Sequence, residues 1–142
     1  MKRFAVAVLA IVAATVPATS TAGASGADAG AAARGGNNLQ ITFVVRSVDG
    51  EPRKIREFKF DNLTTACNQG GPVDVRGQLD TMRVNDAGKF DGNARKDGGK
   101  VHVEGVVKNG GDVVKGTIRA SGKFLPARGC DSGHVEWKAE LN

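Results

Sequence analysis

Leu39-Gln-Ile-Thr-Phe-Val-Val-Arg46 is the stretch of sequence that decides the fold. Its large apolar side chains lie at alternate positions, Leu39, Ile41, Phe43 and Val45. Successive side chains of an extended chain point to opposite faces. This spacing therefore predicts a β-strand with one buried face and one face toward water.

The same alternation recurs along the chain to its C-terminus, and no segment has the apolar spacing of an amphipathic helix. The alternating segments are 57–61, 73–75, 101–107, 114–120 and 134–141. Gly-rich turn sequences separate them, at 49–52, 69–72, 85–88, 97–99 and 109–112. We therefore expect an all-β domain, an antiparallel meander that forms a small barrel or a sandwich of about seven or eight strands.

Four glycines fall inside the alternating segments, at Gly77, Gly92, Gly105 and Gly116. Glycine weakens a strand and often marks a bulge or a sharp bend. We therefore expect bulges or bends at these positions.

The N-terminus has the layout of a secretory signal peptide. Lys2 and Arg3 precede the apolar run 4–16, which Pro17 ends. This run is too short for a membrane-spanning helix, which needs about 20 residues. We expect a signal peptide over 1–24, cleaved after Ala24 or alternatively after Ala22. The mature protein is then secreted, extracellular or at the cell envelope, with no stable membrane anchor.

The residues from Ser25 to Asn38 contain no large apolar side chain. Such a composition contributes little to a core and is typical of a flexible linker. The expected organisation is a signal peptide over 1–24, a flexible linker over 25–38 and a β domain over 39–142.

Cys67 and Cys130 are the two cysteines of the chain. Secreted proteins mature in an oxidising environment, where cysteines usually pair. The sequence therefore predicts one disulfide, Cys67–Cys130, and not a free nucleophilic or metal-binding thiol.

Charge excludes one class of partner. The formal net charge of +5 falls to +3 when Lys2 and Arg3 leave with the signal peptide. The remaining basic residues are interleaved with acidic ones along the sequence, and the chain has one Trp and no Tyr. Nucleic-acid binding usually needs a basic cluster and aromatic stacking platforms, so we expect no nucleic-acid partner. The partner is unknown, with an envelope polymer or an extracellular protein as the candidates.

Two identical tripeptides are the main candidates for metal chemistry. His102-Val-Glu104 and His134-Val-Glu136 each place an imidazole and a carboxylate on one face of a strand. Two such pairs on neighbouring strands could hold zinc. However, the valines fit the core pattern, which puts His and Glu on the wet face, and the segment near 115–120 would separate the pairs. The sequence therefore predicts no catalytic residue, no metal and no cofactor.

The last third of the chain carries a recognisable pattern, Cys130-Asp-Ser-Gly-His-Val-Glu-Trp137. With 58–67 and 88–92 upstream, it resembles a group of small secreted bacterial all-β proteins that have a late Cys-x-Ser/Thr-Gly-x-x-x-Trp segment. The resemblance covers roughly 39–141. It implies the fold and a disulfide, and it carries no activity.

The sequence favours a secreted, non-enzymatic β domain that binds a partner or has a structural role at or outside the cell envelope. An alternative is a small-ligand carrier with an open β-barrel interior. A second alternative is a metal-dependent hydrolase that uses the two His-Val-Glu segments.

Overall fold

The computed structural model of the protein describes residues 26–96 and 98–141, which form ten strands of one antiparallel sheet. The strands are β1 (Gly26–Gly35), β2 (Gln40–Val48), β3 (Glu51–Gln69), β4 (Val73–Leu79), β5 (Met82–Arg83), β6 (Lys89–Lys96), β7 (Gly99–Lys108), β8 (Val113–Phe124), β9 (Ala127–Asp131) and β10 (Val135–Glu140). Two short 3-10 turns, Gly36–Asn38 and Asn109–Gly111, are the only helical elements among these residues. The predicted signal peptide, 1–24, lies outside the described residues. No helix within them is both long and apolar enough to cross a membrane.

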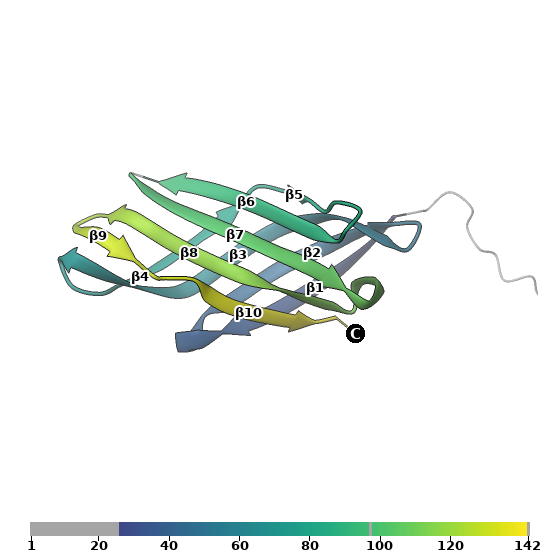
Figure 1. Cartoon of the computed structure of the whole chain (residues 1–142), viewed down its shortest axis with the longest axis horizontal. Helices are drawn as coiled ribbons and strands as arrows, with labels where there is room; N and C mark the ends of the chain where they lie inside the picture. The colour runs from purple at the N-terminus through teal and green to yellow at the C-terminus, as the bar shows by residue number, and fades with distance from the viewer. Residues whose placement is uncertain (1–25, 97, 142) are drawn as a thin grey trace, which may run out of the picture.

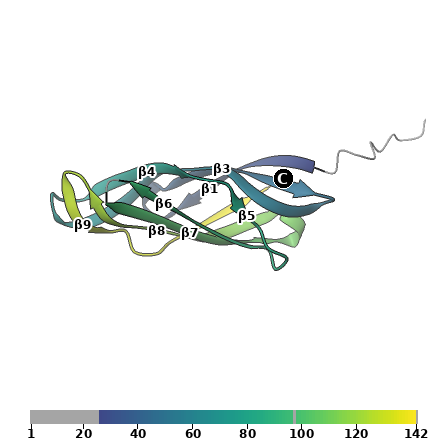
Figure 2. The ribbon, with the colours of Figure 1, turned by 90° about the horizontal axis from the view of Figure 1, so that it is seen from above.

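The sheet folds into two layers, which confirms the predicted all-β class. Strands β6, β7, β8 and β10 form the front layer in Figure 1, and β1, β2, β3 and β4 lie behind them. Figure 2 shows the two layers edge-on in an elongated, flattened molecule. The fold is therefore a β-sandwich whose layers are parts of one continuous sheet.

The two long sides of the sandwich differ. On one side β10 pairs with β8 in its own layer and with β1 in the other layer. At one end, β9 likewise joins β3 to β8. On the other side β6 pairs only with β7, and β4 only with β3, among the described residues. One side is therefore a hydrogen-bonded seam, and the other is open between β4 and β6.

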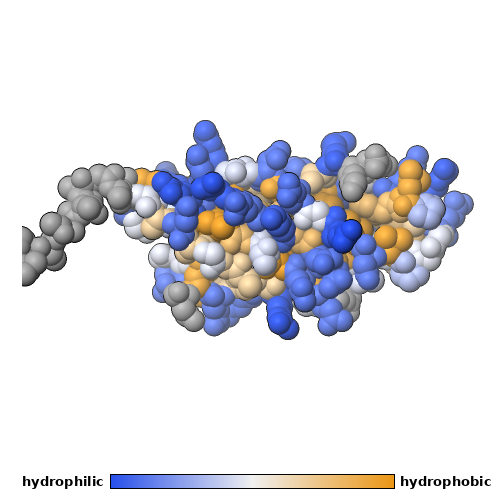
Figure 3. All heavy atoms as spheres, turned by 180° about the vertical axis from the view of Figure 1, so that it is seen from behind, coloured by the Kyte–Doolittle hydropathy of each residue, from blue (hydrophilic) through white to orange (hydrophobic). Residues whose placement is uncertain are grey.

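The interpretation of 25–38 as a flexible linker is wrong for the described part of that segment. Residues 26–35 form β1, which pairs with β2 from Gly26↔Val48 to Arg34↔Gln40. Small side chains suffice because backbone hydrogen bonds hold the strand, and only Ala33 is fully buried. The outer face of the back layer, to which β1 belongs, shows pale and orange atoms between blue, hydrophilic side chains (Figure 3). The β domain therefore includes residues N-terminal to the expected start at Leu39.

The predicted turns occur where the Gly-rich sequences stand. Residues 49–50 join β2 to β3, 70–72 join β3 to β4, and 109–112 join β7 to β8. The loop 84–88 joins β5 to β6. The structure has ten strands where seven or eight were expected, and β1, β5, β6 and β9 have no counterpart among the six alternating segments of the sequence.

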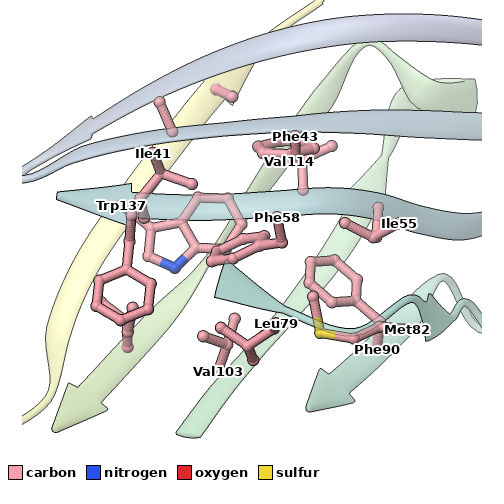
Figure 4. Close-up of a cluster of buried hydrophobic side chains, with 14 of the residues drawn as sticks. Ile41, Phe43, Ile55, Phe58, Leu79, Met82, Phe90, Val103, Val114 and Trp137 are labelled. Carbon is pink, nitrogen blue, oxygen red and sulfur yellow. The ribbon is translucent and has the colours of Figure 1, made fainter. Parts of the chain in front are cut away.

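Trp137 lies at the centre of the core, as its place in the alternating pattern predicts. It is 2% exposed. Its ring centroid lies 5.7 Å from those of Phe43 and Phe58 and 6.3 Å from that of Phe90. These rings come from β2, β3, β6 and β10, so both layers contribute to the cluster (Figure 4). Edge-to-face contacts of this kind add to the stabilisation from burial alone.

Two of the strand glycines create the space that these rings occupy. Gly105 and Gly116 are direct partners across β7 and β8, flanked in register by Phe90 on β6 and Trp137 on β10. A Cβ added at Gly116 would lie 2.9 Å from Cζ2 of Trp137, and one at Gly105 would lie 2.5 Å from Cζ of Phe90. The register runs through both positions without a shift, so the expectation of bulges there is wrong. The glycines admit aromatic rings instead.

The predicted disulfide is present. Cys67 on β3 and Cys130 on β9 are direct cross-strand partners, and their Sγ atoms are bonded at 2.04 Å. The bond therefore fastens the strand that bridges the two layers to the longest strand of the back layer.

Substitution of Gly116 by Ala should destabilise the domain by about 1–3 kcal/mol, because the added methyl group meets the backbone carbonyl oxygen of Glu104 as well as the ring of Trp137. Gly30→Ala is the matched control, since nothing lies within 4 Å of its added Cβ on β1. The control should change stability by no more than about 0.5 kcal/mol. Urea unfolding of both variants measures the difference, and equal effects would contradict the packing argument.

Removal of the disulfide should cost about 4 kcal/mol, because the bond closes a loop with a sequence separation of 63 residues. The Cys67→Ala/Cys130→Ala variant and the reduced wild-type protein should both show this loss in urea unfolding. Reduction should also raise the intact mass by two hydrogens. Two free thiols in the non-reduced protein would rule the bond out.

Candidate functional site

The two predicted His-Val-Glu pairs lie on opposite sides of β8. His102 is on β7, directly across from Arg119 on β8, whereas His134 immediately precedes β10, on the other side of β8. His102 Nδ1 is 2.7 Å from Oδ1 of Asn93, and its Nε2 is 3.8 Å from Oε2 of Glu104. The structure therefore joins His102 to Glu104 and keeps the two histidines on separate strands.

The described residues contain no group of three or more His, Cys, Asp or Glu side chains placed to hold a metal ion. Glu104 and Glu136 both flank Thr117 of β8 in the cross-strand register. The acidic members of the two pairs thus fall in one row on the outer face, while the histidines do not join them.

Arg119 and Asp131 form a two-pronged ion pair between β8 and β9. Arg119 Nε and Nη2 donate to the two carboxylate oxygens of Asp131 at 3.0 and 2.6 Å. The backbone N–H of Gly133 donates to the same carboxylate at 2.8 Å. Hydrogen bonding to Arg119, and secondly to Gly133, lowers the pKa of Asp131 to about 2. This pair holds β9 against β8, so we assign it a structural role.

The outer face of the front layer carries a trough of about 850 Å3. The floor of the trough is the backbone at Gly105 and Gly116. Their cross-strand neighbours, Phe90 and Trp137, point into the core. The residues before and after these four residues point outward, because side chains alternate along a strand. Two rows of outward side chains therefore form the walls of the trough.

One wall, here called the basic row, consists of like charges placed side by side. Lys115 on β8 is directly opposite Lys138 on β10, which is directly opposite Arg34 on β1. Lys89 on β6 completes the row beyond Val106. Like charges placed directly opposite each other destabilise a sheet. The arrangement therefore opposes stability, which makes the row a candidate for a role in binding.

The other wall, the acidic row, is built in the same way. Asp91 is directly opposite Glu104, and Glu136 stands on the far side of Thr117. The rows do not neutralise each other: Glu104 lies near His102, and Lys138 Nζ lies 3.3 Å from Oε1 of Glu140, outside the trough. Opposite charges are therefore segregated on the two sides of one groove.

Lys108, near the end of β7, adds to the positive charge beside the basic row. Hydrogen bonding and repulsion from the Lys115 ammonium group lower the pKa of Lys108. This shift is what a locally high density of positive charge produces.

Sequence reasoning missed both rows. Lys89, Lys115 and Lys138 are far apart along the chain, each beside acidic or apolar residues, so the linear sequence shows no basic cluster. The sequence did hold one signal: Lys89, Lys115 and Lys138 are each next to a residue of the inner row formed by Phe90, Gly105, Gly116 and Trp137. That signal is readable only when the strand register is known.

The Arg119–Asp131 pair makes stability depend on pH in a defined window. Asp131 has a pKa of about 2 in the folded chain and about 3.9 when unfolded. Its stabilising contribution is therefore present above about pH 4 and is lost as the pH falls toward 2. We expect Asp131→Asn to have a lower Tm than the wild type at pH 6, with the difference shrinking as the pH falls to 2. A difference of equal size at both pH values would contradict this assignment.

Comparison of the chain with protein-family models, with curated proteins and with solved structures finds no significant match. The choice of this surface as the candidate site therefore depends on the strand register and the charges described above.

Proposed function

We propose that this protein is a non-enzymatic binding domain that acts outside the cell or at its envelope and holds an anionic polymer along the basic row. The observation that carries the proposal is the direct cross-strand juxtaposition of Arg34, Lys138 and Lys115. A bound polyanion would relieve the repulsion within this row.

The spacing of the row suits a linear, repeating ligand. Neighbouring strands lie about 4.8 Å apart, so a row from β6 to β1 across β7, β8 and β10 extends over roughly 19 Å. A polymer that crosses the strands at a right angle meets these cations in succession. The acidic row lies about 7 Å away along the strands, and it repels an anionic chain that is displaced toward it.

The location has two supports. The N-terminal residues 1–24 are typical of a secretory signal peptide. The Cys67–Cys130 disulfide is compatible with an extracellular location, because such bonds persist in oxidising compartments. An anionic envelope polymer is a partner that a domain in this location would meet.

Nucleic acid is a less suitable ligand for the same surface. Leu125 is the only large apolar side chain that is well exposed among the described residues, so this part of the chain has no exposed aromatic platform. Single-stranded nucleic acids are usually held by base stacking as well as by charge. Charge alone favours a polymer that has no bases to stack.

Polyphosphate is a suitable probe for this proposal, with titration at low and high salt. The Lys115→Gln/Lys138→Gln variant should bind it at least about tenfold more weakly, a loss of about 1.4 kcal/mol. Wild-type binding should also weaken from about 0.05 to about 0.5 M salt, because screening shortens the reach of exposed charges. In contrast, Glu104→Gln/Glu136→Gln should bind more tightly, since it removes the repelling row.

The matched control is Lys59→Gln/Arg128→Gln, which removes the same charge from two exposed residues. Their direct cross-strand partners are uncharged: Thr42, Gln78 and Gln69. This variant should bind within about twofold of the wild type. If both double variants bind polyphosphate equally weakly, the effect comes from net charge alone, which would contradict the proposal. Tighter binding of single-stranded DNA than of polyphosphate at matched charge would also count against it.

A further inference from the structure

The open side of the sandwich contains a second concave surface, separate from the trough. A groove of about 490 Å3 runs between β4 and the β6–β7 edge of the front layer. Apolar side chains form its floor, among them Phe60 of β3, Val101 of β7 and Phe124 of β8. The groove shares no residue with the trough.

One wall of this groove is the free edge of a strand. All six residues from Val73 to Gln78 of β4 line it. Since successive side chains of a strand point to opposite faces, six consecutive lining residues mean that the groove follows the backbone edge. The other edge of β4 pairs with β3, from Thr65↔Val73 to Phe58↔Leu79. Unpaired N–H and C=O groups along a free edge are a template for another strand.

The polar side chains of the groove give it a net positive charge. Arg76, Arg95 and Lys123 line it, and none of them forms an ion pair with another described residue. Its acidic member, Asp74, accepts a hydrogen bond from Thr64 Oγ1 at 2.7 Å. Leu125, at the end of the groove, is 62% exposed. The groove therefore combines an apolar floor, a hydrogen-bonding edge and a cationic rim.

We propose that this groove binds an extended peptide segment, which adds a strand to the free edge of β4. Apolar side chains at alternate positions of the peptide contact the floor, and acidic side chains between them face the cationic rim. Strand addition uses main-chain hydrogen bonds for affinity and alternate side chains for specificity. This site goes beyond the proposed polymer binding, and either could exist without the other.

A small amphipathic anion, such as a fatty acid, would fit the floor and the rim but would leave the backbone edge of β4 unused. The edge is the feature that distinguishes the two occupants. A volume of about 490 Å3 is within the usual range for small-ligand sites, so size alone does not decide between them.

The test uses the acetylated and amidated peptide Val-Glu-Val-Glu-Val-Glu, titrated against the whole domain and followed by amide hydrogen exchange. We expect the peptide to bind and to slow exchange at alternate amides of Val73–Gln78, those that face away from β3. The same peptide with N-methyl groups on alternate residues cannot complete the ladder and should bind at least about tenfold more weakly, a loss of about 1.4 kcal/mol.

Charge reversal provides the second arm. Arg76→Glu/Arg95→Glu should weaken the acidic peptide and bind the Lys-substituted peptide Val-Lys-Val-Lys-Val-Lys in its place. The matched control, Lys54→Glu/Arg128→Glu, carries the same charge change at residues that neither line the groove nor pair with a residue that lines it, and it should retain the original preference.

Several outcomes would overturn the proposal. These are no peptide binding, equal binding of the N-methylated peptide, or protection outside β4. Binding of dodecanoate in the groove without protection of β4 amides would assign the groove to a small-ligand carrier instead. Protection that depends on protein concentration alone would show that a second copy of the domain occupies the edge.

Discussion

The packing of Trp137 against Gly116 is the contact on which the rest of the structure depends. The indole ring lies beside Gly116, where an added Cβ would meet both the ring and the backbone of β7, so this register of β10 on β8 requires glycine there. A slip of one residue would turn every side chain of β10 to the opposite face. Trp137 would then face water, and Lys138 would face the core. The register of β10 on β8 therefore determines both the filled interior and the charged rows on the outer face.

Local alternation predicted the all-β class and the buried Trp137, and the Gly-rich sequences predicted the main turns. The disulfide was predicted from the two cysteines and the secretory context. The strand β1 could not be predicted, because its Ala and Gly residues carry no alternation and backbone pairing with distant strands holds it in place. Gly105 was misinterpreted for a related reason. A sequence shows that a side chain is missing, but not that the ring of Phe90 fills the space.

The charged rows illustrate the same limit at the candidate site. Lys115 and Lys138 lie on strands joined by β9, and only the register makes them direct neighbours. Some charges elsewhere in the fold are paired, as in the two-pronged contact of Arg119 with Asp131. Like charges placed directly opposite each other in a sheet are a departure from local consistency, and such departures are expected at functional sites.

The seam between β1 and β10 also constrains how the chain folds. It joins the first and last strands of the described chain, Gly35 to Trp137, so it is the most non-local strand pairing among the described residues. Closing so long a loop costs conformational entropy before the contact contributes any stabilising free energy. Topologies with high contact order fold slowly, in milliseconds to seconds. The sandwich therefore cannot close along its seam until the C-terminal strand is available. Hairpins that form earlier expose their apolar faces to water until then.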